Sequence, residues 1–207
     1  MVNDSRFYYG VGLLIILISF VVFALGFEKR KPRAREIVML VCMISFAVIG
    51  RVIFYMTPQV KPCAAIIIIT GIALGKKAGF LTGAMTAFVS NFFMGQGPWT
   101  PWQMVAFGLL GYIFGIAYSK RNVGSYIPKK QKNFICFIVV YGVIMDTATV
   151  LMSTDSPSVQ AFITAYTAGF IMNVIHGIST FIFLLFMLIP MLKKIDRVNI
   201  KYGMYVK

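Results

Sequence analysis

Long apolar segments alternate with short polar connections along the whole chain. Runs with few charged residues occur at about 7–27, 37–56, 62–75, 78–94, 102–118, 134–152 and 161–190. A helix of roughly 20 apolar residues crosses a bilayer hydrocarbon core about 30 Å thick. The pattern predicts an all-α polytopic membrane protein. The third and fourth runs read as a short helical pair, and the last run is long enough to tilt, kink or extend past the membrane.

Composition supports a membrane protein. Of the 207 residues, 59% are hydrophobic, against roughly 45–50% in a soluble domain. The formal charge is +14, from 20 Lys and Arg against 6 Asp and Glu, and such an excess in a soluble protein would favour nucleic acid as a partner. The three cysteines all fall in apolar runs without a CxxC or Cys/His cluster, so packing explains them better than a disulfide framework or a zinc site.

The placement of the basic residues predicts the orientation in the membrane. All but three of the 20 Lys and Arg residues fall in alternate connections, on one side of the predicted membrane, and the exceptions are Arg6, Arg51 and Lys61. The positive-inside rule places that side in the cytoplasm. We therefore predict a multi-pass protein of the bacterial cell membrane with its N-terminus outside and its C-terminus in the cytoplasm. Attraction to anionic lipid accounts for the rest of the charge, and nucleic acid is dropped as a partner.

The first apolar run differs from a signal peptide, because it is about 20 residues long and its basic residues mostly follow it. We read it as a true helix. The predicted organisation has three parts, which are an extra N-terminal transmembrane helix with a basic cytoplasmic loop (1–36), a six-helix core (37–190) and a basic cytoplasmic tail (191–207).

Glycines recur every four residues in the stretch GIALGKKAGFLTG, at positions 71, 75, 79 and 83, and again at positions 111 and 115. Small residues at this spacing let helix backbones approach closely in lipid. Tight contact between helices of this protein is the simpler interpretation, and a smooth face for a partner helix is the alternative.

Two charged residues lie within predicted membrane helices, where each costs at least roughly 2.5–3.5 kcal/mol on insertion scales. Arg51 and Asp146 are each about seven residues from the outer end of their segments. At 1.5 Å per residue both lie roughly 10 Å below the outer surface. Depth therefore allows either a structural ion pair between them or a contact with a ligand. His176 is the single histidine of the sequence. A lone histidine more often has a packing role than a catalytic one.

The connection NFFMGQGPWTPWQM (91–104) combines glycines, prolines, glutamines and both tryptophans. An aromatic belt at the membrane interface would explain Trp99 and Trp102 alone. Glycine loosens the backbone while proline stiffens it. The combination also suits a lid over a ligand, with polar groups such as Asn91 and Gln103 beneath it. No P-loop, GxSxG or HExxH motif is present, so the chain shows no ATPase or hydrolase site of its own.

Three stretches, GRVIFYMTPQVKPCAAIIIITGIALG (50–75), AGFLTGAMTAFVSNFFMGQGPWTPWQMVAFGLLGYIFG (78–115) and AGFIMNVIHGIST (168–180), resemble the substrate-binding S-component of energy-coupling factor (ECF) vitamin transporters. Within that group they look most like the cobalamin-associated branch. The resemblance covers most of 37–190 and implies six helices that bind a vitamin under three outer connections. It also implies two kinds of partner, a membrane coupling (T) component and two cytoplasmic ATPase subunits, and no enzymatic activity or cofactor.

The resemblance gives roles to the residues noted above, with cobalamin or a related corrinoid as the transported ligand. Aromatic residues would cover its apolar surface: Tyr55, Trp99, Trp102 and Tyr166. Polar residues would bond its polar groups: Gln59, Lys61, Asn91, Gln96 and Gln103. Asn173 and His176 would form the pocket floor, and Arg51 would pair with Asp146 or contact the ligand.

In this family, the first core helix often docks to the coupling component through an Ala-xxx-Ala face. The first core helix of this chain lacks that pattern. Val41 and Ser45, or Cys42 and Phe46, have that spacing instead, and Gly71, Gly75 and Gly79 offer a second smooth surface. Other functions stay open. They are an S-component for riboflavin, pantothenate or a queuosine precursor, an intramembrane enzyme that uses Asp146, Asp155 and His176, and a solo facilitator without ATPases.

Overall fold

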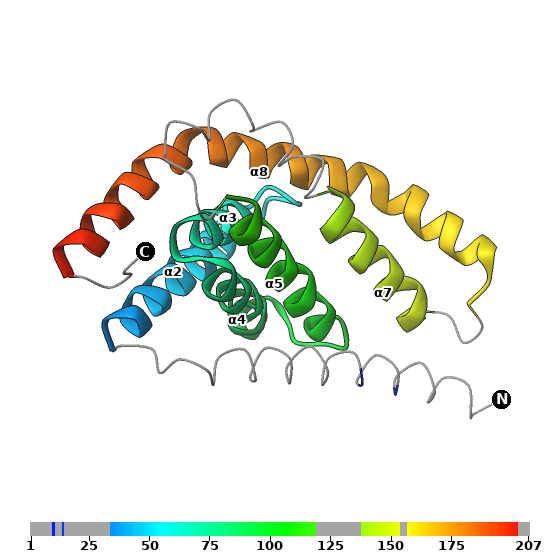
Figure 1. The fold of residues 1–207 in the computed structure, drawn as a ribbon. Coiled ribbons are helices and arrows are strands. Elements are labelled where there is room, and N and C mark those ends of the chain that lie inside the picture. Colours follow the sequence, from blue (N-terminus) through cyan, green and yellow to red (C-terminus); the bar gives the residue numbers. More distant parts are fainter. Residues whose placement is uncertain (1–9, 11–13, 15–33, 119–137, 154–156, 203–207) are drawn as a thin grey trace.

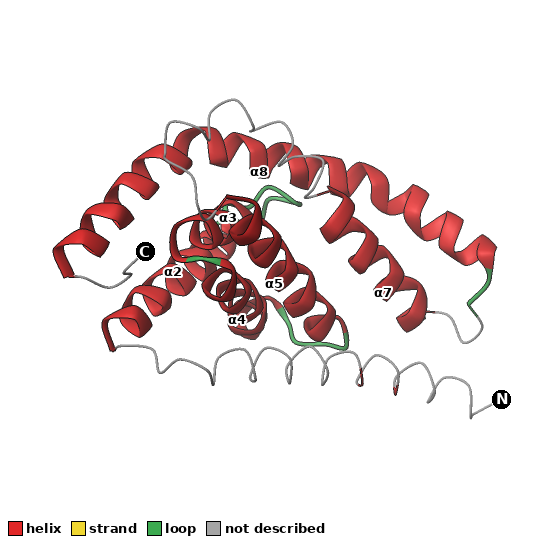
Figure 2. Ribbon diagram, in the orientation of Figure 1, coloured by secondary structure: helices red, strands yellow, loops and turns green. Residues whose placement is uncertain are grey.

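The computed structural model describes residues 10, 14, 34–118, 138–153 and 157–202. These residues form helices and connections without a strand among them (Figure 2). The elements are α2 (Ala34–Ile53), α3 (Cys63–Leu74), α4 (Lys76–Met94), α5 (Trp99–Tyr118), the π-helical turn η2 (Ile138–Gly142), α7 (Val143–Ser153) and α8 (Val159–Tyr202). The prediction of an all-α protein is confirmed for this part of the chain. The predicted helix at 7–27 and the loop residue Asp155 lie outside the described residues, apart from Gly10 and Leu14.

Helices α2 to α5 form a bundle, and α8 arches over it while α7 lies against the first half of α8 (Figure 1). Within the described residues, three helices are long and apolar enough to cross a membrane, namely α2, α5 and α8. The membrane-spanning segments expected from the sequence therefore have sufficient length and apolar composition at these three helices. The helices α3 and 139–153 are apolar but shorter.

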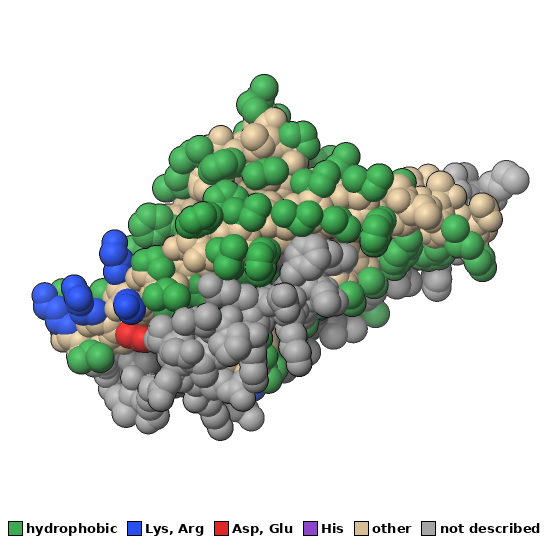
Figure 3. Space-filling model, turned by 90° about the horizontal axis from the view of Figure 1, so that it is seen from above, with side chains coloured by type: hydrophobic (Ala, Val, Ile, Leu, Met, Phe, Trp, Pro, Cys, Tyr) green, Lys and Arg blue, Asp and Glu red, His purple; other side chains and the backbone are tan. Residues whose placement is uncertain are grey.

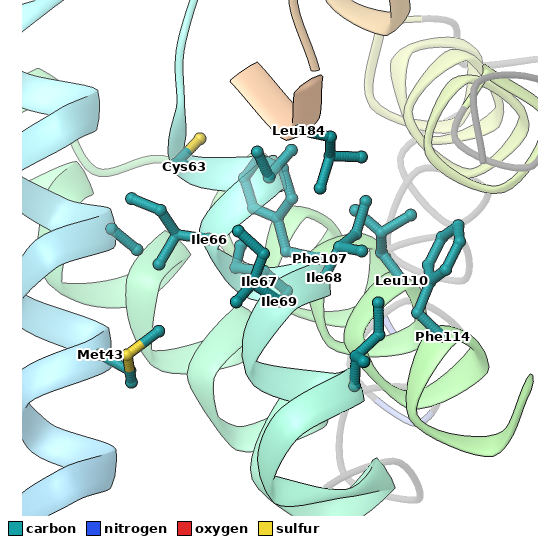
Figure 4. Packing of buried hydrophobic residues seen from close by; sticks show 14 of the residues in the cluster. Met43, Cys63, Ile66, Ile67, Ile68, Ile69, Phe107, Leu110, Phe114 and Leu184 are labelled. Carbon is teal, nitrogen blue, oxygen red and sulfur yellow. The ribbon is translucent and has the colours of Figure 1, made fainter. Parts of the chain in front are cut away.

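The helix α3 is the centre of the bundle. It has 12 residues, about 18 Å at helical rise, which is too short for the hydrocarbon core. Every side chain from Ile66 to Ile69 is 3% exposed or less, and Figure 4 shows these side chains beside Phe107, Leu110 and Leu184 from other helices. Apolar helices of 10–14 residues are typical of protein cores, so α3 is enclosed by protein on all sides.

Glycines bring α3, α4 and α5 into direct backbone contact. A Cβ atom at Gly71 or Gly79 would collide with the backbone carbonyl of Gly111, and one at Gly83 would collide with that of Phe107. These residues are buried. The predicted close packing through glycine is confirmed at these positions. Gly75 differs, because its φ of 93° forms the turn between α3 and α4 and nothing lies near it.

Two helix boundaries change the interpretation of the sequence. The helix α5 begins at Trp99, so both tryptophans belong to its first turns and the connection from α4 is only 95–98. The helix α8 runs on through Pro190 to Tyr202, so the basic stretch expected as a separate tail from residue 191 continues the last core helix. Its Leu192 and Ile195 side chains join the hydrophobic core.

Candidate functional site

A buried arginine joins the ends of α2, α4 and α5. Arg51, in the last turn of α2, is 6% exposed. Its Nη1 donates to Oγ of Ser90 at 2.5 Å and to Oδ1 of Asn91 at 3.0 Å. Its Nη2 donates to Oε1 of Gln103 at 3.2 Å. One side chain therefore fixes three helices at the same end of the bundle.

A second layer of hydrogen bonds closes around Asn91. Its Nδ2 donates to Oγ1 of Thr100 and to Oε1 of Gln103, both at 2.9 Å. The Thr100 hydroxyl in turn donates to Oε1 of Gln96 at 2.9 Å and accepts from the backbone N–H of Gly97 at 3.3 Å. These bonds hold the short 95–98 connection onto the helix ends. We call the six side chains the Arg51 network: Arg51, Ser90, Asn91, Gln96, Thr100 and Gln103.

Aromatic rings lie directly beneath the Arg51 network. The guanidinium carbon of Arg51 is 5.6 Å from the ring centre of Phe107, a distance at which a cation is attracted by the ring face. Tyr141 of η2 lies against Phe107 at 4.9 Å. His176 meets both rings edge-on, at 6.4 Å from Phe107 and 5.1 Å from Tyr141. His176 is thus 3% exposed and part of an aromatic cluster.

A separate polar seam joins α7 to α8. Nδ2 of Asn173 donates to Oδ2 of Asp146 at 2.9 Å. A Cβ atom at Gly169 would collide with the Asp146 carboxylate, and one at Gly142 would come within 2.7 Å of Nδ2 of Asn173. Each polar side chain therefore lies over a glycine of the opposite helix. Next to Asp146 along α7, the hydroxyl of Thr147 shares a hydrogen bond of 2.9 Å with the hydroxyl of Tyr166 on α8.

The ion pair between Arg51 and Asp146, one of the two alternatives for these charges, is absent from the described residues. The guanidinium bonds to neutral side chains of α4 and α5, and the carboxylate bonds to Asn173. The pair was one alternative because the two residues lie at similar depths along their helices. Equal depth does not bring two side chains together when their helices lie on different sides of the bundle. The remaining alternative, in which Arg51 contacts a ligand, stays a prediction.

The connection between α2 and α3 packs on the middle of α8. The backbone N–H of Lys61 donates to Oγ of Ser179 at 3.1 Å. Burial lowers the pKa of the Lys61 ammonium, and the neighbouring charge of Arg51 lowers it further. Gln59 has a φ of 59°, a left-handed conformation that is uncommon outside glycine. Tyr55 is 55% exposed.

The two tryptophans lie at the start of α5, above the Arg51 network. Trp99 is 41% exposed, and its ring lies against Gly97, where a Cβ atom would collide with it. Trp102 is half-buried, one residue before Gln103 of the network. Aromatic residues beside buried amides suit a ligand with both a flat apolar face and polar groups.

Most of the expected site residues fall into two groups, while Tyr55, Gln59 and Lys61 lie apart in the connection between α2 and α3, and Trp99 and Trp102 lie at the start of α5. The first group is the Arg51 network with the rings beneath it, and it includes His176. The second is the seam of Asp146, Tyr166 and Asn173 on α7 and α8. Ser90 and Thr100 complete the first group and were missed from the sequence, because a hydroxyl beside a predicted amide was the only signal for them.

The residues expected to form the partner surface are exposed on α2 but buried on α3 and α4. Val41 is 52% exposed on α2 and Ser45 is also exposed. Gly71 and Gly79 are buried against α5, so the prediction that they face a partner is wrong for the isolated chain. Gly75 forms the turn described above.

Comparison with known proteins gives the family. Residues 34–194 match the family model described as "ECF-type riboflavin transporter, S component", a range that begins with α2 and ends within α8. The chain belongs to this family. The prediction of an S component is confirmed, whereas its placement in the cobalamin-associated branch finds no support. The matched family is one of transporters, which is consistent with the expectation that the chain has no enzymatic activity.

More distant similarity is limited. Two UPF0397 proteins of Aliivibrio fischeri, from strains MJ11 and ES114, are each 30% identical to this S component over 82 residues, which are 39% of this chain and 44% of each relative. The matching region thus spans less than half the length of these curated relatives. No solved structure matches the chain.

Proposed function

We propose that this S component is the membrane-embedded substrate-binding subunit of an ATP-driven vitamin importer, and that its substrate is riboflavin. The family description supports the substrate class. The Arg51 network carries the proposal, because it gathers buried hydrogen-bonding groups beneath aromatic residues at one end of the bundle. Flavins combine a flat ring system with an edge of carbonyl and N–H groups, and both parts match this arrangement.

Riboflavin would contact the rim with its ring face and the network with its polar edge. Trp99 and Trp102 would cover the ring, and Gln103 would bond the edge while Asn91 holds Gln103 in place. Tyr55, Gln59 and Lys61 would approach from the connection between α2 and α3. The seam of α7 and α8 would support the site from the side. Cobalamin is the competing ligand, and the same binding experiment includes it.

Transport requires partners, since no P-loop is present in the sequence. We propose a coupling component that docks on the exposed face of α2, at Val41 and Ser45, and two ATPase subunits that act through it. Uptake that continues without any ATPase would instead identify a solo facilitator.

Binding is tested with the detergent-purified protein and free riboflavin, followed by the quenching of flavin fluorescence. We expect saturable binding at one flavin per chain, and no binding of cobalamin in a parallel absorbance titration. If the protein bound cobalamin but not riboflavin, the proposed substrate would be a corrinoid instead of riboflavin. Absence of both would reject the ligand assignment and leave the family unchanged.

The place of the ring is tested by Trp102→Ala. Loss of a large buried aromatic contact is worth about 1–3 kcal/mol, so we expect roughly a 5- to 150-fold weaker affinity for riboflavin. Phe186→Ala is the matched control, because Phe186 is an aromatic residue 74% exposed on α8. Unchanged affinity in a folded Trp102→Ala protein would contradict the covering role.

A further inference from the structure

Arg51 is a buried positive charge whose described partners are all neutral. It donates to a serine hydroxyl and to two amide oxygens. Three carboxylates are described, those of Glu36, Asp146 and Asp196. None of them is among the partners of Arg51, and Glu36 lies 15 positions earlier on the same helix, about 22 Å away at helical rise. A charge inside a membrane protein normally has a counter-charge or a function.

The guanidinium also retains hydrogen-bonding capacity. It carries five N–H donors in a plane, and its bonds to Ser90, Asn91 and Gln103 use three of them. The donor on Nε and the second donor on Nη2 have no partner among the described residues. These two nitrogens are bonded to the same carbon. Donors arranged in this way suit a pair of adjacent acceptor atoms better than a single one.

The surroundings add positive charge. Lys61 is close enough to Arg51 for the two charges to oppose each other. The other titratable groups that interact electrostatically with Arg51 are Cys63 of α3, Tyr141 of η2 and His176 of α8. On α4 and α5 the groups facing Arg51 are neutral. The described part of this end of the bundle therefore holds two cations and no compensating carboxylate.

We infer that Arg51 holds the imide edge of the bound flavin, where two carbonyl oxygens flank an N–H group, and that it favours the deprotonated, anionic imide. The inference rests on the proposed substrate. The imide anion presents its nitrogen and one flanking carbonyl oxygen, two adjacent acceptors, to the remaining donors, and it supplies a negative charge beside the guanidinium. The only bond that breaks is the N–H bond of the imide, and the proton leaves to solvent. Arg51 thereby selects flavins over ligands of similar shape that lack such an edge.

The experiment is an absorbance titration of riboflavin bound to the intact, detergent-solubilised S component, with free riboflavin measured in parallel. We expect the bound imide to lose its proton at lower pH than the free imide. The affinity for riboflavin then rises with pH until the free imide titrates, by up to tenfold for each pH unit of difference. A bound imide that titrates like the free one overturns the inference while riboflavin binding stands. Absence of riboflavin binding overturns the inference and the proposed function together.

Variants then assign the shift to Arg51. Arg51→Gln should abolish the shift of the imide titration and weaken binding at least tenfold, whereas Arg51→Lys should keep part of the shift. Arg35→Gln is the matched control, because Arg35 is an exposed arginine at the other end of α2. Lys61→Met measures the contribution of the second cation. An Arg51→Gln protein that binds riboflavin with the wild-type imide titration shows a purely structural role. If this variant fails to fold, the wild-type titration alone still decides.

Discussion

The side-chain amide of Asn173 donates a hydrogen bond of 2.9 Å to the carboxylate of Asp146. This bond holds α7 against α8 and gives the Asp146 carboxylate a partner on its own side of the bundle. Arg51 is left to organise the opposite group of helices. Two independent polar clusters therefore stabilise the bundle, and their independence can be measured.

Double-mutant cycles should separate the two clusters. Asp146→Ala and Asn173→Ala share one hydrogen bond to a charged group, so we expect a coupling of about 1–3 kcal/mol in the free energy of unfolding. Asp146→Ala and Arg51→Ala share no partner and should be additive within about 0.5 kcal/mol. The measurement is denaturant unfolding in mixed micelles. A strong coupling free energy between Arg51 and Asp146 would instead show that the two charges form an ion pair.

The contact between α4 and α5 should not tolerate a methyl group at Gly111. A Cβ atom there would lie within 2.9 Å of the Cα atom of Gly79 and closer still to its carbonyl. Overpacking of this kind costs about 1–3 kcal/mol, so Gly111→Ala should lower the melting temperature clearly. Ala117→Leu is the control on the exposed face of the same helix. Equal melting temperatures for the two variants would mean that the close approach does not exist.

Gln103→Glu should stabilise the protein and weaken its binding of riboflavin. A carboxylate at this position keeps an oxygen that accepts from Arg51 and Asn91, and it supplies a negative charge beside the guanidinium. The new pair then competes with the ligand for the charge of Arg51. We expect a higher melting temperature without ligand and at least tenfold weaker affinity. A variant that binds riboflavin more tightly would contradict this account.

Lys61 gives a pH dependence with a definite sign. Its ammonium titrates near 10.5 in the unfolded chain, and burial lowers the pKa in the folded protein. Between the folded and the unfolded pKa the unfolded chain binds more protons, so the stability contribution of this group rises with pH in that window. The melting temperature of wild type minus that of Lys61→Met should therefore rise as the pH approaches 10.5. A difference that is constant with pH would refute the lowered pKa.

Bulky substitution on α2 should separate partner binding from ligand binding. Ser45→Trp adds volume to the face proposed to meet the coupling component, and the exposed position requires no repacking of the bundle. We expect loss of co-purification with the coupling component while riboflavin affinity stays within twofold. Ile116→Trp on α5 is the control, since Ile116 is 56% exposed on another helix. Equal co-purification for both variants would place the interface elsewhere.

Local sequence patterns predicted much of this fold. The spacing of Gly71, Gly79 and Gly83 indicated tight helix contacts, because only glycine lets backbones meet so closely. The polar positions Arg51 and Asn91 were recognised as a candidate site because a membrane interior makes polar groups conspicuous. Both signals depend on one residue and its neighbours along the chain.

Other features depend on rotation and on distant segments, which a linear pattern does not contain. Depth along two helices suggested a pair between Arg51 and Asp146, yet each faces different neighbours. The prolines near Trp99 suggested a loop, but proline is also accepted in the first turn of a helix, and α5 begins there. The ligand branch could not be fixed from the sequence, because mixed aromatic and polar residues fit many vitamins.

The length of α8 has a mechanical consequence. Its 44 residues extend about 66 Å at helical rise, more than twice the roughly 30 Å of hydrocarbon in a bilayer. A large part of α8 must therefore lie outside the hydrocarbon core. Figure 3 shows Lys and Arg side chains gathered at the C-terminal end of this helix. Because no loop interrupts it, the segment next to the α7 seam and the charged end are joined by one continuous helix, which curves over the bundle and passes through Pro190. A displacement of the first turns is therefore passed along the backbone of a single helix to the residues around Arg197.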